Sequence, residues 1–203
     1  MDMKLRMTPK LVPAILLALA IPIACFAVNP GENAPAFALT ATDGETYDSK
    51  NVVANHEATV IVFTCNTCPV ARAYEDRIIA TAKEYAPRKV AFLAVNPNDA
   101  DKIPQENMES MKKRAAEKGF PFPYLRDDTQ SVAKSYGAKV TPHFFVADKS
   151  GVIRYVGRFD NNQQQNPNVK TATDLKNALD AVLAGNEPLT SATKAFGCGI
   201  KWK

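Results

Sequence analysis

Two continuous apolar stretches, at residues 59–63 and 90–95, dominate the middle of the sequence. Stretches of this length without polar alternation are typical of strands that are buried on both faces of a sheet. Between them, apolar residues recur at helical spacing and predict a helix that ends before Pro87. Its apolar face is expected to consist of Val70, Tyr74, Ile78, Ala82 and Tyr85. A strand, a helix and a parallel strand in this order predict a right-handed crossover unit.

Three further segments have the apolar spacing of helices: residues 106–118, 129–136 and 171–184. The first two are followed by Gly119 and Gly137, and glycine is the residue most often found just past a helix C-terminus. Helices are therefore expected on both sides of the remaining strands.

The sheet is predicted to contain an antiparallel part as well. Residues 140–146 and 152–156 are mostly apolar and enclose a turn-forming segment at 148–151, which predicts a hairpin. A short strand at residues 37–39 is expected to pair across the turn at Asp43-Gly44. Together with the crossover unit, these strands predict a central mixed sheet flanked by helices, which is an α/β fold.

The first 27 residues have the pattern of a removable leader. Basic residues precede an apolar run over residues 11–24, and a Cys25-Phe26-Ala27 site follows, with small residues at its first and third positions. This pattern is that of a secretory signal peptide, and the run is shorter than the roughly 20 residues that a membrane span needs. We therefore expect cleavage after Ala27, a periplasmic or secreted protein, a domain over residues 28–187, and an apolar tail over residues 188–203 that packs on it.

Cys25 leaves a second interpretation of the leader open. Ile23-Ala24-Cys25 resembles the end of a lipoprotein cleavage site, which would place a lipid anchor at Cys25, although Pro22 stands where that pattern prefers leucine. In neither case is a permanent transmembrane span expected. The formal net charge of +4 over 203 residues is modest and gives no support to a nucleic-acid partner.

The candidate chemistry lies between the first long strand and its helix, at residues 65–69, Cys-Asn-Thr-Cys-Pro. Both thiols fall at a predicted helix N-terminus, where unpaired N–H groups and the helix dipole favour a thiolate. Two cysteines at this spacing can form a reversible disulfide. The chain is therefore predicted to be redox-active, with Cys65 and Cys68 as the catalytic pair and no organic cofactor. Cys198 is a candidate accessory thiol, and a packed free cysteine is the alternative.

These motifs together resemble the thioredoxin-like superfamily over about residues 30–185. Residues 31–37, GENAPAF, and residues 136–142, YGAKVTP, resemble its redoxin branch, which includes peroxiredoxins and exported thioredoxin-like reductases. The resemblance implies that Pro142 is a cis-proline that faces the dithiol, and that the Thr141 backbone binds a substrate cysteine or peptide. It also implies partners that carry thiols or disulfides, and an electron donor that the sequence does not identify.

Two assignments of the nucleophile stay open within this resemblance. Thioredoxin-like reductases attack with the first cysteine, here Cys65, which is expected to be the more exposed one. Peroxiredoxins attack with a cysteine followed by proline, here Cys68, but the threonine that they hold three residues earlier falls at Cys65. Reduction or exchange of disulfides is therefore the expected activity, with peroxide reduction as an additional one. Glu57 is the nearest candidate base, although an ordinary surface glutamate is the commoner case.

Two other classes of function compete with the redox one. Copper chaperones of the Sco type share the thioredoxin fold and bind the metal through two cysteines and a distant histidine. Cys65, Cys68 and His143 are therefore the alternative ligand set for copper, with His56 as a weaker ligand. A structural Cys65–Cys68 disulfide in a binding module is the other alternative, although so short a loop gains little stability from closure.

Overall fold

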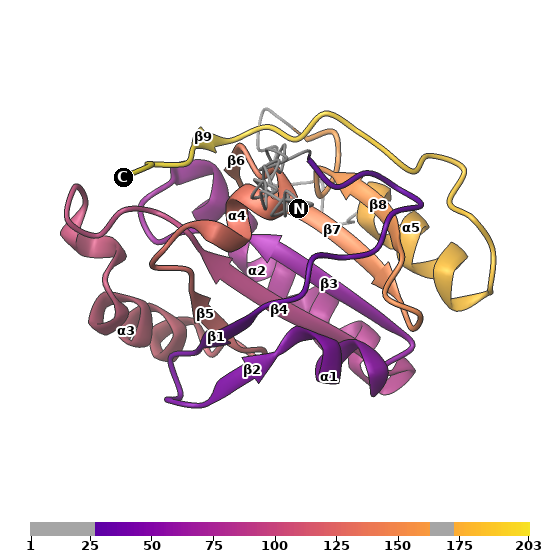
Figure 1. Ribbon diagram of the computed structural model, residues 1–203, viewed down its shortest axis with the longest axis horizontal. Helices are drawn as coiled ribbons and strands as arrows, with labels where there is room; N and C mark the ends of the chain where they lie inside the picture. Colours follow the sequence, from indigo (N-terminus) through magenta and orange to yellow (C-terminus); the bar gives the residue numbers. More distant parts are fainter. Residues whose placement is uncertain (1–26, 163–172) are drawn as a thin grey trace, which may run out of the picture.

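The computed structural model describes residues 27–162 and 173–203 of the chain (Figure 1). Its centre is a five-stranded sheet whose middle strand, β3, is parallel to one neighbour and antiparallel to the other. From edge to edge the strands are β5 (Tyr124–Arg126), β4 (Val90–Asn96), β3 (Ala58–Phe63), β7 (His143–Asp148) and β8 (Ile153–Gly157). The predicted mixed sheet is confirmed.

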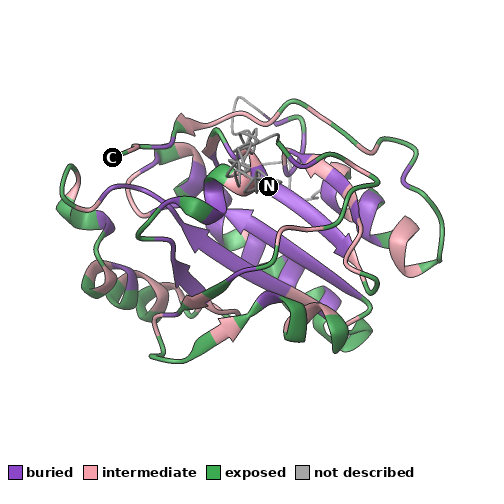
Figure 2. Cartoon of the chain, in the orientation of Figure 1, coloured by how far each residue is buried: buried purple, intermediate pink, exposed green. Residues whose placement is uncertain are grey.

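Helices and loops cover both faces of this sheet, so its central strands are almost wholly buried (Figure 2). Successive residues of β3 point to opposite faces: Val60 joins one apolar cluster and Ile61 the other. This explains why β3 and β4 are apolar without alternation. The helices are α1 (Ser49–Ala54), α2 (Pro69–Tyr85), α3 (Met108–Lys118), α4 (Ser131–Tyr136) and α5 (Thr173–Leu183).

Helix α2 forms as the sequence predicts. Pro69 occupies its first turn, where the missing N–H costs nothing, and the helix ends at Tyr85 before the 3-10 turn Ala86–Arg88. Tyr74, Ile78, Ala82 and Tyr85 are buried as expected, whereas Val70 is only partly buried. The helix therefore packs on the same face of the sheet as α5, in the cluster that contains Leu175 and Leu179.

The start of α3 differs from the prediction. The expected helix over residues 106–118 begins at Met108, because Asn107 has extended backbone angles and its side chain accepts a hydrogen bond from Ser110 N–H as an N-cap. Glu106 instead ends a 3-10 turn, Pro104–Glu106, and is completely buried. Its side chain is thereby free to point toward the end of β3.

The smaller strands form two further pairs. β1 (Ala38–Thr40) and β2 (Thr46–Asp48) form the predicted hairpin across Asp43-Gly44. Pro142 interrupts the predicted strand at residues 140–146, so β6 (Val140–Thr141) separates from β7 and pairs antiparallel with β9 (Cys198–Gly199). In Figure 1 the segment after α5, in yellow, runs past β8 to reach β6.

The predicted leader lies outside the described residues except for Ala27, and so do Cys25 and the first two residues of the last predicted helix. Over the parts of the chain that are described, no helix combines the length and the apolar character that crossing a bilayer requires.

Candidate active site

The two cysteines of the motif lie where β3 gives way to α2. Cys68 is the N-cap of α2, and its Sγ accepts a hydrogen bond from the Ala71 N–H at 3.4 Å. Both cysteines are 2% exposed. The expectation that Cys65 is the more exposed of the two is therefore wrong, because further segments cover the whole helix N-terminus.

The loop before β7 supplies one of these covering segments. The Thr141–Pro142 peptide bond is cis, and Thr141 contacts both thiols. Its Oγ1 lies 3.1 Å from Cys65 Sγ, and its carbonyl oxygen accepts a hydrogen bond from Cys68 Sγ at 3.2 Å. The structure therefore brings Cys65, Cys68, Thr141 and Pro142 together.

Cys198 reaches the same point from the tail. In the pairing of β6 with β9, Thr141 is opposite Cys198 and Val140 is opposite Gly199. Cys198 is partly buried and packs against the cluster of Cys65, Cys68 and Ala71. Three free thiols of the described chain thus share one site, and the tail covers the strand on which the resemblance places a substrate peptide.

The three thiols differ in acidity, chiefly because of their hydrogen bonds and burial. The pKa of Cys68 is lowered to about 5, chiefly because the Cys65 thiol donates a hydrogen bond to it; the Cys198 thiol and the N–H groups of Ala71 and Cys198 add to this against burial. The pKa of Cys65 is raised far above its ordinary value by that same hydrogen bond, by burial and by the charge of Glu106. Burial, followed by the hydrogen bond to Cys68, raises the pKa of Cys198 to about 11.

One contact works against a thiolate at Cys68. The Thr141 carbonyl oxygen, at 3.2 Å, accepts a hydrogen bond from the neutral Cys68 thiol but repels the anion. The donors from Cys65, Cys198 and Ala71 favour the anion and lower the pKa of Cys68. Hydrogen bonding in the site therefore favours a thiolate at Cys68 over one at Cys65 or Cys198.

Glu106, which sequence reasoning missed, holds the loop between the two cysteines. Its buried carboxylate accepts hydrogen bonds from the backbone N–H groups of Asn66 at 2.8 Å and Thr67 at 3.0 Å. The Thr67 hydroxyl and the side-chain amides of Asn96 and Asn98 donate to the same carboxylate. These donors compensate the buried charge and commit the loop N–H groups to Glu106 instead of a thiolate. No local pattern marks Glu106, because its partners come from other segments of the chain.

Glu57 and the two histidines lie in other environments. Glu57 is exposed and pairs with Lys149 at 3.5 Å, so the acid near the dithiol is Glu106 and not Glu57. The His143 ring lies against the Phe145 ring, with centroids 4.6 Å apart and the planes tilted by 43°. Burial together with the charge of Lys139 lowers the pKa of His143 to about 4. His143 therefore stays neutral at physiological pH.

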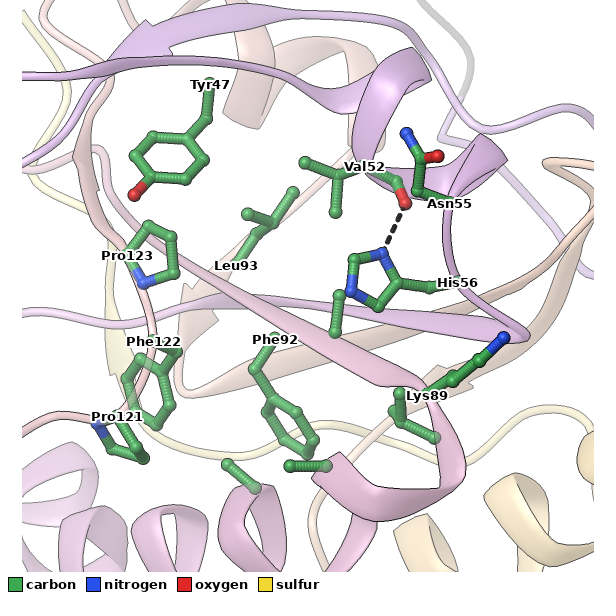
Figure 3. A pocket seen from close by; sticks show the side chains of 14 residues that line it. Tyr47, Val52, Asn55, His56, Lys89, Phe92, Leu93, Pro121, Phe122 and Pro123 are labelled. Atoms are coloured by element: carbon green, nitrogen blue, oxygen red, sulfur yellow. Dashed lines mark hydrogen bonds between the residues drawn. The ribbon is translucent and has the colours of Figure 1, made fainter.

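His56 belongs to a pocket that contains neither Cys65 nor Cys68. It lines this pocket together with Phe92 and Phe122, and its Nδ1 donates a hydrogen bond to the Val52 carbonyl at 2.7 Å (Figure 3). Within residues 27–162 and 173–203, no three or more His, Cys, Asp and Glu side chains come together as metal ligands. The alternative copper set of Cys65, Cys68 and His143 is thus not assembled in this structure.

The comparisons with known proteins agree with this architecture. Residues 30–156 match the AhpC/TSA family, and the chain belongs to this family. The fold is the thioredoxin-like one that the motifs predicted, in its redoxin branch, and the family is one of thiol oxidoreductases.

Two solved structures are similar over most of their length. An uncharacterized conserved protein from Geobacillus kaustophilus is 40% identical with a TM-score of 0.81, and the match covers 86% of this chain and 92% of that one. A hypothetical protein from Sinorhizobium meliloti 1021 is 34% identical with a TM-score of 0.82, covering 88% and 97%. A thiol:disulfide interchange protein of the thioredoxin family from Chlorobium tepidum TLS shares the fold at 19% identity, with a TM-score of 0.60 and coverage of 78% and 99%. No curated protein matches the sequence significantly.

Proposed function

We propose that this protein is a thiol–disulfide oxidoreductase that cycles between the Cys65–Cys68 dithiol and an internal disulfide, with Cys68 as the attacking thiolate. The observation that carries the proposal is the difference in acidity within the pair. The pKa of Cys68 is lowered to about 5 while that of Cys65 is raised, and the hydrogen bond between them is the largest cause of both shifts. A thiolate beside a protonated thiol suits attack by the first and resolution by the second.

Reduction of a disulfide takes two exchanges. The Cys68 thiolate attacks one substrate sulfur, so a mixed disulfide forms, the substrate disulfide breaks, and the leaving sulfur departs as a thiolate that takes a proton from solvent. Cys65 then attacks the Cys68 sulfur, which forms the internal disulfide and releases the second substrate sulfur. Two electrons pass from the dithiol to the substrate, and the reverse sequence oxidises a substrate dithiol.

The same hydrogen bond also affects when Cys65 can attack in the second exchange. The pKa of Cys65 is raised first of all because its thiol donates to Cys68. When Cys68 enters a mixed disulfide it is no longer an anion, and this cause of the raised pKa disappears. Cys65 therefore becomes easier to deprotonate at the stage when its thiolate is needed.

Peroxide reduction is a second candidate, and the burial of both cysteines favours it, because a small peroxide needs less access than a protein disulfide. The Cys68 thiolate would attack one peroxide oxygen, become a sulfenic acid and release water or an alcohol. Cys65 would then attack the sulfenic sulfur and release water as the internal disulfide forms. The electron donor in either cycle is a protein or small-molecule thiol, and the leader pattern supports action outside the cytoplasm.

The test is the redox equilibrium of the purified protein in buffers of reduced and oxidised thiol, with cysteine pairing read by mass spectrometry. We expect a reversible Cys65–Cys68 couple between about −120 and about −270 mV, the span of thiol-exchange proteins. A couple below about −300 mV would contradict the proposal, because it would make the disulfide structural. Single-turnover oxidation by hydrogen peroxide and by an oxidised cysteine peptide then shows which substrate reacts faster.

A further inference from the structure

The short strand β9 lies on the backbone of the loop that faces the dithiol. It pairs antiparallel with β6 (Figure 1). This pairing places Cys198 opposite Thr141, whose carbonyl oxygen contacts Cys68. Addition of one extended strand to a free strand edge is a common way for a protein to bind a peptide. The tail therefore occupies this edge as an extended peptide with a cysteine would.

Specific contacts hold the tail on both sides of Cys198. After it, the Ile200 N–H donates to the Lys139 carbonyl at 3.1 Å and the Lys201 carbonyl accepts from the Asp99 N–H at 2.9 Å. Before it, the Thr193 N–H donates to the Val156 carbonyl at 2.9 Å. These backbone hydrogen bonds of the tail therefore hold Cys198 beside Cys68.

We propose that Cys198 is a third redox-active thiol of this site, and that the tail serves as a tethered peptide substrate whose cysteine exchanges with Cys68. This inference rests on the proposed function of the dithiol. It assigns to the tail the place of a cysteine-containing peptide, bound by strand addition to β6.

The exchange needs no external oxidant. Starting from the Cys65–Cys68 disulfide, Cys198 attacks the Cys68 sulfur, so that a Cys68–Cys198 bond forms and the Cys65–Cys68 bond breaks. Cys65 leaves as a thiolate, and the proton lost by Cys198 returns to it. The disulfide thereby moves from two thiols that are 2% exposed to one that includes the more accessible Cys198. A bulky partner thiol can then attack at Cys198 without entering the site.

Two glycines beside Cys198 provide a matched pair of variants. Gly197 has a φ of 155°, and a Cβ added there would lie 2.0 Å from the Thr141 carbonyl oxygen. A Cβ added at Gly199 would meet no atom within 4 Å. Gly197→Ala therefore forces β9 away from β6, whereas Gly199→Ala adds the same methyl group without a clash.

The experiment uses the full chain with Cys65→Ser, equilibrated in reduced and oxidised glutathione, quenched with acid, alkylated and mapped by mass spectrometry. We expect an intramolecular Cys68–Cys198 disulfide that forms reversibly. Adding Gly197→Ala should lower the effective concentration of Cys198 at Cys68 at least about tenfold, and adding Gly199→Ala should change it less than about twofold. Circular dichroism of each variant establishes that the domain is folded.

Two results would overturn the inference. If Cys65→Ser gives only a mixed disulfide of Cys68 with glutathione, Cys198 does not exchange. If Gly197→Ala and Gly199→Ala leave the Cys68–Cys198 yield equal, strand pairing with β6 does not place the thiol. Either result leaves the wild-type Cys65–Cys68 couple intact, whereas failure of that couple in the unsubstituted chain contradicts the proposed function itself.

Discussion

Two segments bring cysteines to the same point, and they are built differently. The loop between Cys65 and Cys68 follows local rules, since a buried strand ends, a cap residue follows, and a proline opens the helix. The tail around Cys198 forms only a two-residue strand, which exists because β6 is there to pair with it. A local motif thus places Cys65 and Cys68 near each other, whereas packing between distant segments covers them.

The largest expected effect distinguishes the roles of Cys65 and Cys68. Cys68→Ser removes the thiolate, so reaction with a chromogenic aromatic disulfide should slow by at least about 1,000-fold. Cys65→Ser keeps the thiolate and should complete the first exchange but stop at the mixed disulfide, which mass spectrometry detects. Rapid first exchange in Cys68→Ser, together with its loss in Cys65→Ser, would reverse the assignment of the nucleophile.

The second-largest effect is expected at Glu106, which anchors the loop between the two cysteines. Glu106→Gln keeps the shape of the side chain but replaces one carboxylate oxygen with an NH2 group, which cannot accept hydrogen bonds from the surrounding donors. The free energy of unfolding of the reduced protein should therefore fall by about 2 to 4 kcal/mol. Loss of the negative charge should also lower the pKa of Cys65. Urea unfolding measures the first effect. The exposed Glu109→Gln is the control and should change stability by less than about 0.5 kcal/mol.

An equal loss in Glu106→Gln and Glu109→Gln would mean that the buried carboxylate does not stabilise the loop between the cysteines.

The corresponding anchor of the tail is Gln130, whose side-chain amide donates to the Pro97 and Lys201 carbonyls at 2.7 and 2.8 Å and accepts from the Lys203 N–H at 2.8 Å. Gln130→Ala should weaken docking of the tail by about 1 to 2 kcal/mol, which corresponds to an alkylation rate of Cys68 about tenfold higher. Alkylation by iodoacetamide, followed by mass spectrometry, measures this rate.

The exposed Gln105→Ala is the matched control for Gln130→Ala and should leave alkylation unchanged. If Gln130→Ala lowers global stability without speeding alkylation, the tail is not the barrier that covers the dithiol.

The smallest expected effect is a shift in the pH at which Cys68 ionises, which depends on both the loop and the tail. Because the pKa of Cys68 is lowered to about 5 and that of Cys198 is raised to about 11, the reduced protein should carry one thiolate at neutral pH. The ultraviolet absorption of this thiolate should vanish as the pH falls through about 5, and Cys68→Ser should lack the step. Cys198→Ala removes one donor and should move the step to higher pH. An unchanged midpoint would mean that the tail thiol does not stabilise the anion.

The parts of the fold that follow local rules were predictable. β3, α2 and β4 have long, strongly patterned sequences, and their positions agree with the structure. α1 and β5 were missed because each is short, and β5 follows Pro121 and Pro123 with no apolar alternation. These elements depend on neighbours for stability, which a single stretch of sequence does not show.

The site shows the same division. Cys65 and Cys68 were recognisable from their spacing at a helix start, but Glu106 was assigned to a helix because its burial depends on donors from Asn66, Thr67 and Asn96. Cys198 was recognised as an unpaired thiol, whereas its position opposite Thr141 follows from strand pairing between distant parts of the chain. Acidity differences among the thiols depend on these contacts and could not be derived from residue identity alone.

The tail also protects an edge of the central sheet from other molecules. The Val156 N–H of β8 donates to the Ser191 carbonyl at 3.0 Å, and the Val156 carbonyl accepts from the Thr193 N–H. Without this segment the hydrogen-bonding groups of β8 would be open to pairing with a second molecule, which is a route to aggregation. Removal of residues 188–203 is therefore expected to expose this edge of the sheet and to make the protein prone to aggregation.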